Sequence, residues 1–255
     1  MALDLVTIPC LSDNYAYLIH DAESGETALI DAPEAAPILA ELQRRNWTLD
    51  HILLTHHHDD HTGAVADILA KAPAKVWGAA ADAHRLPELS HSVQDGDTHA
   101  LCGEEMMVMD VSGHTIGHVA FYFAQSGLLF SADSLMALGC GRLFEGTAAQ
   151  MHASLSKLAQ LPPDTLVCSG HEYATSNAAF ARTIEPDNAE LISRTDAIAA
   201  ARAHGRATVP STLSLELATN PFLRAHIPDV QAQIGMSGQD PVDVFAEIRA
   251  RKDRF

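Results

Sequence analysis

A dense group of potential metal ligands stands at residues 55–61, which read Thr-His-His-His-Asp-Asp-His and follow a short apolar run. His56 and His58 are two residues apart, so in an extended segment both side chains leave the same face. Asp60 and His61 stand where the chain turns into an apolar-periodic stretch, and from there they can point back at the same spot. Imidazole nitrogens and carboxylate oxygens suit zinc and its first-row neighbours. The alternative is a solvated, histidine-rich turn, which would need no partners elsewhere in the chain.

Three more candidate ligands stand where expected strands end. They are His114 after 106–111, Asp133 after 128–130, and His171 after 166–168. Loops at one edge of a sheet can bring such residues together. Taken singly, a His or Asp at a strand end is more often a cap or a surface residue. Together with the 55–61 group they supply seven ligands, which is too many for one tetrahedral ion, so the sequence predicts two ions that share a bridging carboxylate.

The composition limits the class of protein. The 255 residues include 16 basic and 33 acidic side chains, a formal net charge of −17. Such a charge repels nucleic acid, so we expect no nucleic-acid partner. No stretch has the roughly 18 uncharged apolar residues of a membrane helix, and the N-terminus lacks a secretory signal. The four cysteines form no C-x-x-C pair, so a disulfide framework or a cysteine-zinc site is not expected. We therefore expect a cytoplasmic protein without a membrane partner. A monomer is our expectation for the oligomeric state, which these features do not determine.

Basic residues are unevenly placed along the chain. None occurs between Arg85 and Arg142, yet four stand in the last seven positions. These four are Arg249, Arg251, Lys252 and Arg254. Four cations are too few for a nucleic-acid groove, but they could hold a small ligand that carries carboxylates.

The residue pattern predicts a mixed α/β region followed by a helical one. Strands are expected at 5–9, 14–19, 27–31, 51–55, 75–78, 106–111, 119–123, 128–130 and 166–169, and helices at 37–45, 60–71 and 147–161. The last of these helices should begin at a capping box formed by Thr147 and Gln150. After Tyr173, the Ala-rich segments 178–183, 187–204 and 241–252 are helix-periodic. The sequence therefore predicts a metal-binding catalytic domain at 1–174 and a helical substrate-binding domain at 175–255.

Residues 55–61 resemble the T-H-x-H-x-D-H signature of the metallo-β-lactamase superfamily. Further segments resemble glyoxalase II, namely Gly139–Thr147, Gly170–Tyr173, Asn177, Ala218–Arg224 and Arg249–Asp253. The resemblance spans nearly the whole chain. It implies an α/β protein with a metallo-β-lactamase-like αβ/βα sandwich and a C-terminal all-helical domain. It also implies hydrolysis of S-D-lactoylglutathione, a glutathione thioester, to D-lactate and glutathione, the second step of methylglyoxal detoxification.

The resemblance implies a role for each candidate ligand. His56, His58 and His114 would hold the first metal, Asp60, His61 and His171 the second, and Asp133 would bridge them. Asp60 and Asp133 are the candidate catalytic residues, and zinc is the expected metal at both sites, with iron or manganese as alternatives. His57 and Asp59 point elsewhere by alternation. Asp31 either orients a ligand imidazole or is a simple turn residue at a strand end.

The resemblance also implies the contacts to glutathione. These would come from Arg142, Tyr173, Asn177, Arg249 and Lys252. For Arg249 and Lys252 the alternative is stabilisation of the helix macrodipole by cations near its C-terminal end. Many relatives have Lys where Arg142 stands and Tyr where Phe144 stands. Arg keeps the charge but changes its geometry, and Phe144 lacks a hydroxyl donor, so affinity could be weaker or the acyl preference broader.

Hydrolysis by metal-activated water needs neither a nucleophilic side chain nor a general acid. A single bound zinc lowers the pKa of water from about 16 to about 7, and a thiolate whose thiol has a pKa of about 8.5 leaves without a general acid. The sequence has no G-x-S-x-G elbow and no catalytic-cysteine signature. The competing readings are a lactonase or β-lactamase on the same scaffold, a single-iron persulfide dioxygenase, and a nucleic-acid-processing or non-catalytic binding protein. The glutathione-type tail opposes a lactonase or β-lactamase. The net charge opposes a nucleic-acid-processing protein, and the complete ligand set opposes a non-catalytic binding protein.

Overall fold

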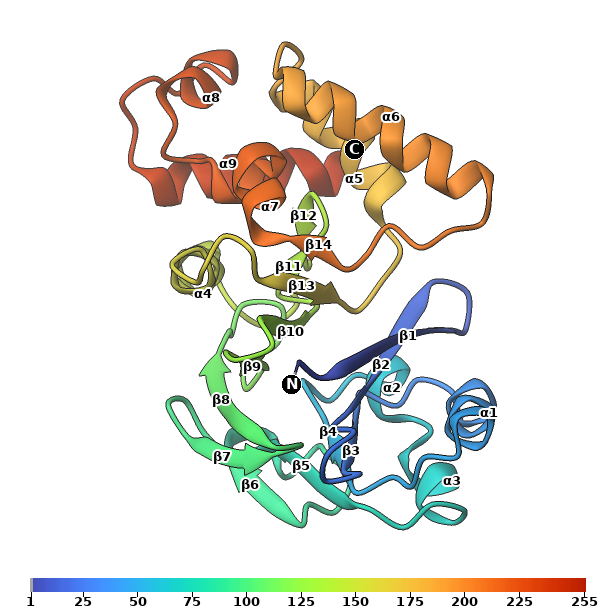
Figure 1. Ribbon diagram of the computed structural model, residues 1–255. Coiled ribbons are helices and arrows are strands. Elements are labelled where there is room, and N and C mark those ends of the chain that lie inside the picture. Colours follow the sequence, from blue (N-terminus) through green and yellow to red (C-terminus); the bar gives the residue numbers. More distant parts are fainter. Residues whose placement is uncertain (1) are drawn as a thin grey trace. The chain divides into compact units, whose positions relative to one another are not determined.

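The structure is a computed structural model that describes residues 2–255, and the chain divides into two compact units (Figure 1). The first unit runs up to Val111 and resumes over Ile116–Ala132, and the second comprises Ser112–Thr115 and Asp133–Phe255. The chain therefore passes between the units three times. None of these three crossings coincides with residue 174, after which the sequence becomes helix-periodic. The division into domains at residue 174 stays a prediction.

A six-stranded sheet forms the centre of the first unit. Its strands, in spatial order, are β1 (Asp4–Cys10), β2 (Asn14–His20), β3 (Thr27–Ile30), β4 (His51–Leu53), β5 (Lys75–Ala79) and β6 (His91–Val93). The first three are antiparallel and β3 to β6 are parallel. Helices α1 (Ala35–Arg45) and α3 (Val65–Leu69) cover one face, where Ile38 and Ile68 pack into one apolar core with Leu29 and Ile52.

A four-stranded antiparallel meander completes the first unit. It consists of β7 (Thr98–Leu101), β8 (Glu104–Asp110), β9 (Val119–Phe123) and β10 (Leu128–Ala132). Every residue of β9 and β10 is buried, so these strands read as continuous apolar runs rather than alternating ones. The Phe130 ring lies 5.6 Å from that of Tyr17 on β2 and 5.9 Å from that of Phe123, which joins the meander to the six-stranded sheet.

The second unit is mainly helical. Its strands are the short hairpin β11 (Leu135–Met136) and β12 (Gly139–Cys140), and the antiparallel pair β13 (Leu166–Ser169) and β14 (Ser211–Thr212). Its helices are α4 (Ala148–Leu158), α5 (Ala174–Ile184), α6 (Ala189–Ala203), α7 (Leu213–Thr219), α8 (Pro228–Gln233) and α9 (Pro241–Arg254), with a 3₁₀ turn η2 (Pro221–Leu223). Buried Phe180, Phe222 and Phe245 pack in one aromatic cluster, and burying each contributes about 1.5–3 kcal/mol.

Local signals explain several helix starts. The predicted capping box is confirmed, because the Thr147 hydroxyl accepts from the Gln150 backbone and the Gln150 side chain accepts from Thr147. Asn188 caps α6, and Asp240 caps α9 directly before Pro241. Among residues 2–255, no helix combines the length and the apolar character needed to cross a membrane.

The expected helix at 60–71 is two short helices, α2 (Asp59–Thr62) and α3. The helical hydrogen-bond pattern is interrupted because the Ala64 amide donates to the Ala32 carbonyl, 3.0 Å away, rather than to its own helix. Several short elements carry too little periodicity to be expected from the sequence. These are β6, β7, β14, α7 and α8.

Candidate metal centre

The four candidate ligands of the first unit gather directly after β4. His56 Nε2 lies 3.1 Å from His58 Nδ1, and the His56 and His61 rings are 4.2 Å apart. Asp60 Oδ2 lies 3.8 Å from His61 Nε2. The period-two spacing of His56 and His58, followed by the turn into α2, therefore brings these side chains together as the sequence predicts.

The buried Asp31 carboxylate orients two of these imidazoles. It accepts from the Thr55 amide and hydroxyl at 2.9 and 2.8 Å, and its Oδ2 lies 2.8 Å from His61 Nδ1. The Thr55 hydroxyl proton is committed to Asp31, so its oxygen accepts from His56 Nδ1, 3.0 Å away. Both histidines thus carry the proton on Nδ1 and the lone pair on Nε2. Of the two alternatives for Asp31, the orienting role fits the structure.

Two further residues near this group were not expected from the sequence. The Asn14 amide donates to the Asp60 backbone and carboxylate oxygens at 3.0 and 3.1 Å. The His118 ring stacks on His56, with ring centroids 4.6 Å apart and an interplanar angle of 11°. Asn14 begins β2 and His118 precedes β9, so nothing in their local sequence context distinguishes them from ordinary strand-end residues.

His57 takes a different direction from its two neighbours. Its Nδ1 lies 3.0 Å from Oδ2 of Asp82, a carboxylate that is 1 % exposed and that also accepts from the Arg85 guanidinium at 2.8 Å. Asp59 is exposed. Both observations agree with the prediction that His57 and Asp59 point away from the ligand group.

The second unit brings two candidate histidine ligands close to the carboxylate of the third candidate, Asp133. Asp133 Oδ2 lies 3.4 Å from His114 Nε2 and 3.3 Å from His171 Nε2, and all three residues are buried. His114 Nδ1 donates to the Arg142 carbonyl at 2.8 Å, because a carbonyl can only accept. His114 Nε2 therefore directs its lone pair toward a carboxylate oxygen. A proton shared in an imidazolium–carboxylate pair or a bound cation would stabilise two electron-rich atoms at this distance, and a divalent metal ion fits this donor set.

Glycine is required where the chain passes closest to these ligands. A Cβ added to Gly141 would lie 2.1 Å from the Asp133 carbonyl oxygen and 2.8 Å from His114 Nδ1. At Gly113, which adopts φ +154°, a Cβ would lie 2.7 Å from the Met151 Cβ atom. Any larger residue at either position would displace the segment that carries a candidate ligand.

Three candidate substrate contacts present accessible groups. Tyr173 is 39 % exposed and its ring stacks on His171 at 4.6 Å. Arg142 is exposed, and Lys252 is half-buried with Nζ 3.3 Å from the Ser176 carbonyl. Burial lowers the pKa of Lys252, and the nearby positive charges of Arg249 and Arg142 lower it further. This part of the second unit is therefore locally positive in a chain of strongly negative net charge.

Asn177 and Arg249 are placed differently from the other three. They are 6 % and 4 % exposed, and both donate to backbone carbonyls of the β11–β12 hairpin. Arg249 also pairs with Asp253 at 2.8 Å. Two of the three guanidinium nitrogens of Arg249 are therefore engaged within the chain. Direct contact of these two residues with glutathione stays a prediction.

The four cysteines offer no alternative nucleophile. All are free and buried. Burial raises the pKa of Cys10 and of Cys140 to about 11, so neither is a thiolate near neutral pH. This agrees with the expectation of neither a disulfide framework nor cysteine catalysis.

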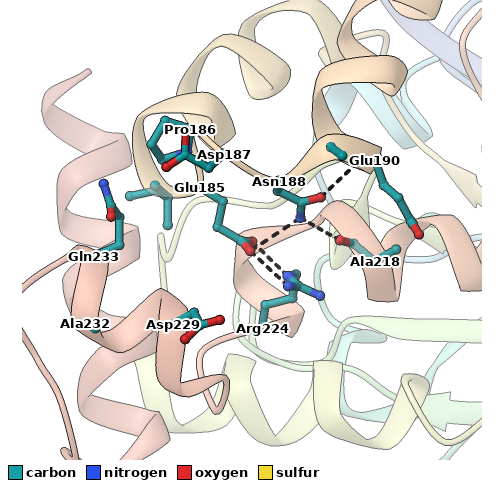
Figure 2. A pocket seen from close by; sticks show the side chains of 12 residues that line it. Glu185, Pro186, Asp187, Asn188, Glu190, Ala218, Arg224, Asp229, Ala232 and Gln233 are labelled. Carbon is teal, nitrogen blue, oxygen red and sulfur yellow. Dashed lines mark hydrogen bonds and ion pairs between the residues drawn. The ribbon is translucent and has the colours of Figure 1, made fainter.

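A cavity of about 770 Å³ within the second unit contains none of the candidate ligands or substrate contacts (Figure 2). Part of its polar lining is engaged within the chain. Glu185 forms a bidentate pair with Arg224 at 2.8 and 2.9 Å, and the Asn188 amide donates to the Ala218 carbonyl at 2.9 Å. We therefore assign this cavity no part in the chemistry.

Comparison with known proteins identifies the class that these features define. Residues 12–171 match the family model of the metallo-beta-lactamase superfamily, and residues 172–255 match that of the hydroxyacylglutathione hydrolase C-terminus. The structure called TTHA1623 in a di-iron-bound form has a TM-score of 0.62 and is 28 % identical, over 86 % of this chain and 100 % of its own.

Two relatives match over almost their full length. The hydroxyacylglutathione hydrolase of Jannaschia sp. is 64 % identical over 98 % of both chains, and that of Ruegeria pomeroyi is 63 % identical over 100 % of both. The chain therefore belongs to the metallo-beta-lactamase superfamily and, within it, to the hydroxyacylglutathione hydrolases. The fold and the family predicted from the sequence are confirmed.

Replacing Asp133 tests the ligand assignment. Asp133→Ala removes the carboxylate that faces two imidazoles, and we expect the purified variant to lose most of its bound metal and nearly all activity. His57→Ala, which alters a neighbour of two ligands that itself contacts Asp82, should keep much of both. Metal analysis and a hydrolysis assay on the two variants decide the matter, and equal losses would contradict the assignment.

Proposed function

We propose that the protein hydrolyses S-D-lactoylglutathione, with water, to D-lactate and glutathione by means of two divalent metal ions. The observation that carries the proposal is the Asp133 carboxylate between His114 Nε2 and His171 Nε2, in a chain whose full-length relatives are named hydroxyacylglutathione hydrolase. A carboxylate in this position suits a ligand shared by two ions.

We assign the ligands as the family resemblance implies. His56, His58 and His114 would hold one ion, Asp60, His61 and His171 would hold the other, and Asp133 would serve both. The lone pairs on Nε2 of His56, His61 and His114 support this assignment, because each is directed by a hydrogen bond at Nδ1. We propose zinc, while iron remains the main alternative because the 28 % identical structure carries two irons.

Two divalent ions held there would supply Lewis-acid chemistry, lowering the pKa of water and favouring negative charge on the thioester oxygen. Asp31 holds two imidazoles in the tautomer that can bind metal, and Asn14 holds the Asp60 carboxylate. No general acid is needed, because a thiolate leaves readily. Glu172 follows His171 and is the nearest acidic residue in sequence, but its carboxylate accepts from the Thr208 amide and hydroxyl at 2.9 and 2.5 Å, which agrees with a reaction that does not use it.

The substrate is recognised through its glutathione part. We propose that Lys252 and Arg142 bind its carboxylates and that Tyr173 packs against it, with Asn177 and Arg249 completing the site. The nearby positive charges of Arg249 and Arg142 support this, since an anionic ligand would neutralise them; after burial, they are the next causes of the lowered pKa of Lys252. We also propose the domain division at 174, which is supported by the family-model bounds of 171 and 172. The cytoplasmic location and the monomeric state stay predictions.

Thiol release and metal content together test the proposed function. Purified protein should release thiol from S-D-lactoylglutathione and contain close to two metal ions per chain. It should act far more slowly on a β-lactam and on a lactone, because neither carries glutathione. One ion per chain, or preferred turnover of the β-lactam or lactone, would contradict the proposal.

Lys252 should act in binding. Lys252→Ala removes a charged hydrogen-bond partner, which costs roughly 1.5–3 kcal/mol, or about 10- to 150-fold. Because the contact is remote from the thioester, we expect KM for S-D-lactoylglutathione to rise strongly while kcat falls much less. Hydrolysis of a small thioester without the tripeptide should stay nearly unchanged, as should metal content. Equal losses on both substrates would mean that the residue serves only the fold.

The lowered pKa of Lys252 predicts a pH dependence of binding. The protonated ammonium binds a carboxylate, and it is lost as the pH rises through a pKa below the ordinary lysine value. KM should therefore rise on the alkaline side, after correction for uncatalysed hydrolysis. Lys252→Arg keeps its charge there, so its KM should stay flat over the same range. A parallel rise in both proteins would exclude Lys252 as the titrating group.

A further inference from the structure

Side chains from the helical part of the second unit bind five consecutive residues of the β11–β12 hairpin. Asn220 donates to the Met136 and Gly139 carbonyls at 3.1 and 3.0 Å, Asn177 to the Ala137 carbonyl at 3.0 Å, and Arg249 to the Cys140 carbonyl at 3.0 Å, while Glu216 accepts from the Leu138 amide at 2.9 Å. The hairpin itself pairs only two residues on each side. Its conformation is therefore imposed by these side chains, which we call the hairpin clamp.

The centre of the clamp is a buried, charge-compensated network. Glu216 and Asn220 are 0 % exposed, and the second carboxylate oxygen of Glu216 pairs with Arg194, which is 6 % exposed. The same oxygen accepts from the Ser211 hydroxyl at 2.5 Å. A buried ion pair often contributes less to stability than apolar residues of similar volume would. The network instead fixes the orientation of the Glu216 carboxylate, so that its other oxygen faces the Leu138 backbone amide.

That amide belongs to a residue in an unfavourable conformation. Leu138 adopts φ +56°, a left-handed geometry that costs roughly 1–2 kcal/mol for a residue with a Cβ atom. The hydrogen bond from its N–H to Glu216 and the two carbonyl bonds to Asn220 on either side hold it there. Asn220 is itself fixed, because its Oδ1 accepts from the Phe222 amide at 3.1 Å.

The base of the hairpin touches two candidate metal ligands. Gly141 follows β12, its amide donates to the Ser134 carbonyl at 3.3 Å, and it packs against the Asp133 carbonyl. The next residue, Arg142, accepts the Nδ1 proton of His114 through its carbonyl. A shift of the hairpin would therefore move Asp133 and release the hydrogen bond that selects the His114 tautomer.

We propose that Glu216 and Asn220 are positioning residues for hydrolysis, which act through the hairpin on Asp133 and His114. The proposal rests on the proposed function, but it also makes a claim about metal retention that is independent of the substrate. Outer residues that orient metal ligands typically contribute 10- to 100-fold to metal affinity or activity.

Asn220→Ala tests the proposal, with Asn188→Ala as the matched control. Asn188 is an asparagine of the same unit that donates to a backbone carbonyl and caps a helix, yet it contacts no part of the hairpin. Both full-length variants should unfold at a lower temperature. At an assay temperature where each is folded by circular dichroism, Asn220→Ala should lose 10- to 100-fold in kcat and release metal to a competing chelator at a lower chelator concentration. Asn188→Ala should match the wild type in both.

The outcomes separate the two proposals. If the wild type releases no thiol from the glutathione thioester, the proposed function fails, whereas the chelator competition still tests positioning. Wild-type kcat and metal retention in folded Asn220→Ala, or equal losses in Asn188→Ala, would overturn the positioning role. Should Asn220→Ala not fold, Glu216→Gln decides, since it keeps an acceptor for the Leu138 amide but loses the charge that Arg194 orients. It should show smaller losses of the same kind, and wild-type behaviour would overturn the proposal.

Discussion

The lone pair of an imidazole nitrogen and the negative charge of a carboxylate repel one another unless a proton or a metal cation stands between them. Asp133 Oδ2 lies 3.4 Å from His114 Nε2, whose ring carries its proton on Nδ1, and 3.3 Å from His171 Nε2, and all three side chains are buried. Burial removes the water that would otherwise weaken this repulsion. Neighbouring residues of the second unit preserve this arrangement. Gly141 lets the chain pass beside Asp133, and the Arg142 carbonyl accepts the Nδ1 proton of His114.

The same requirement explains the contacts in the first unit. Asp31 accepts from the Thr55 amide, the Thr55 hydroxyl and His61 Nδ1, and the Thr55 oxygen in turn accepts from His56 Nδ1. Nε2 of both histidines is therefore left without a proton. The Asn14 amide restrains the Asp60 carboxylate. These contacts cost conformational entropy when the chain folds, and none of them adds to an apolar core. They make sense as preparation of ligands before metal arrives, because a ligand held in its binding tautomer and orientation loses little freedom when the ion binds.

The seven candidate ligands could be predicted because their evidence is local. Four lie within six residues at a strand-to-helix turn, and three stand at strand ends, where side-chain direction follows from strand periodicity. The same holds for the capping box at Thr147. Asn14, Asp82 and Glu216 could not be predicted, because their partners are 25 to 78 residues away and no local pattern encodes such a pairing. The backbone contacts of Asn177 and Arg249 could not be predicted either, because the carbonyls that they bind belong to residues 40 and 109 positions away.

The interleaved boundary of the two units bears on how such a protein can arise. Ser112–Thr115 belongs to the second unit, although the chain on both sides of it belongs to the first. A gene fragment that began at Asp133 would encode that residue and His171 but would lack His114. The three candidate ligands of the second unit therefore cannot be transferred on a contiguous fragment that begins at Asp133. A shuffling event that separates the chain at residue 132 divides this group, so residues 114–171 have to be inherited together if the group is to be kept.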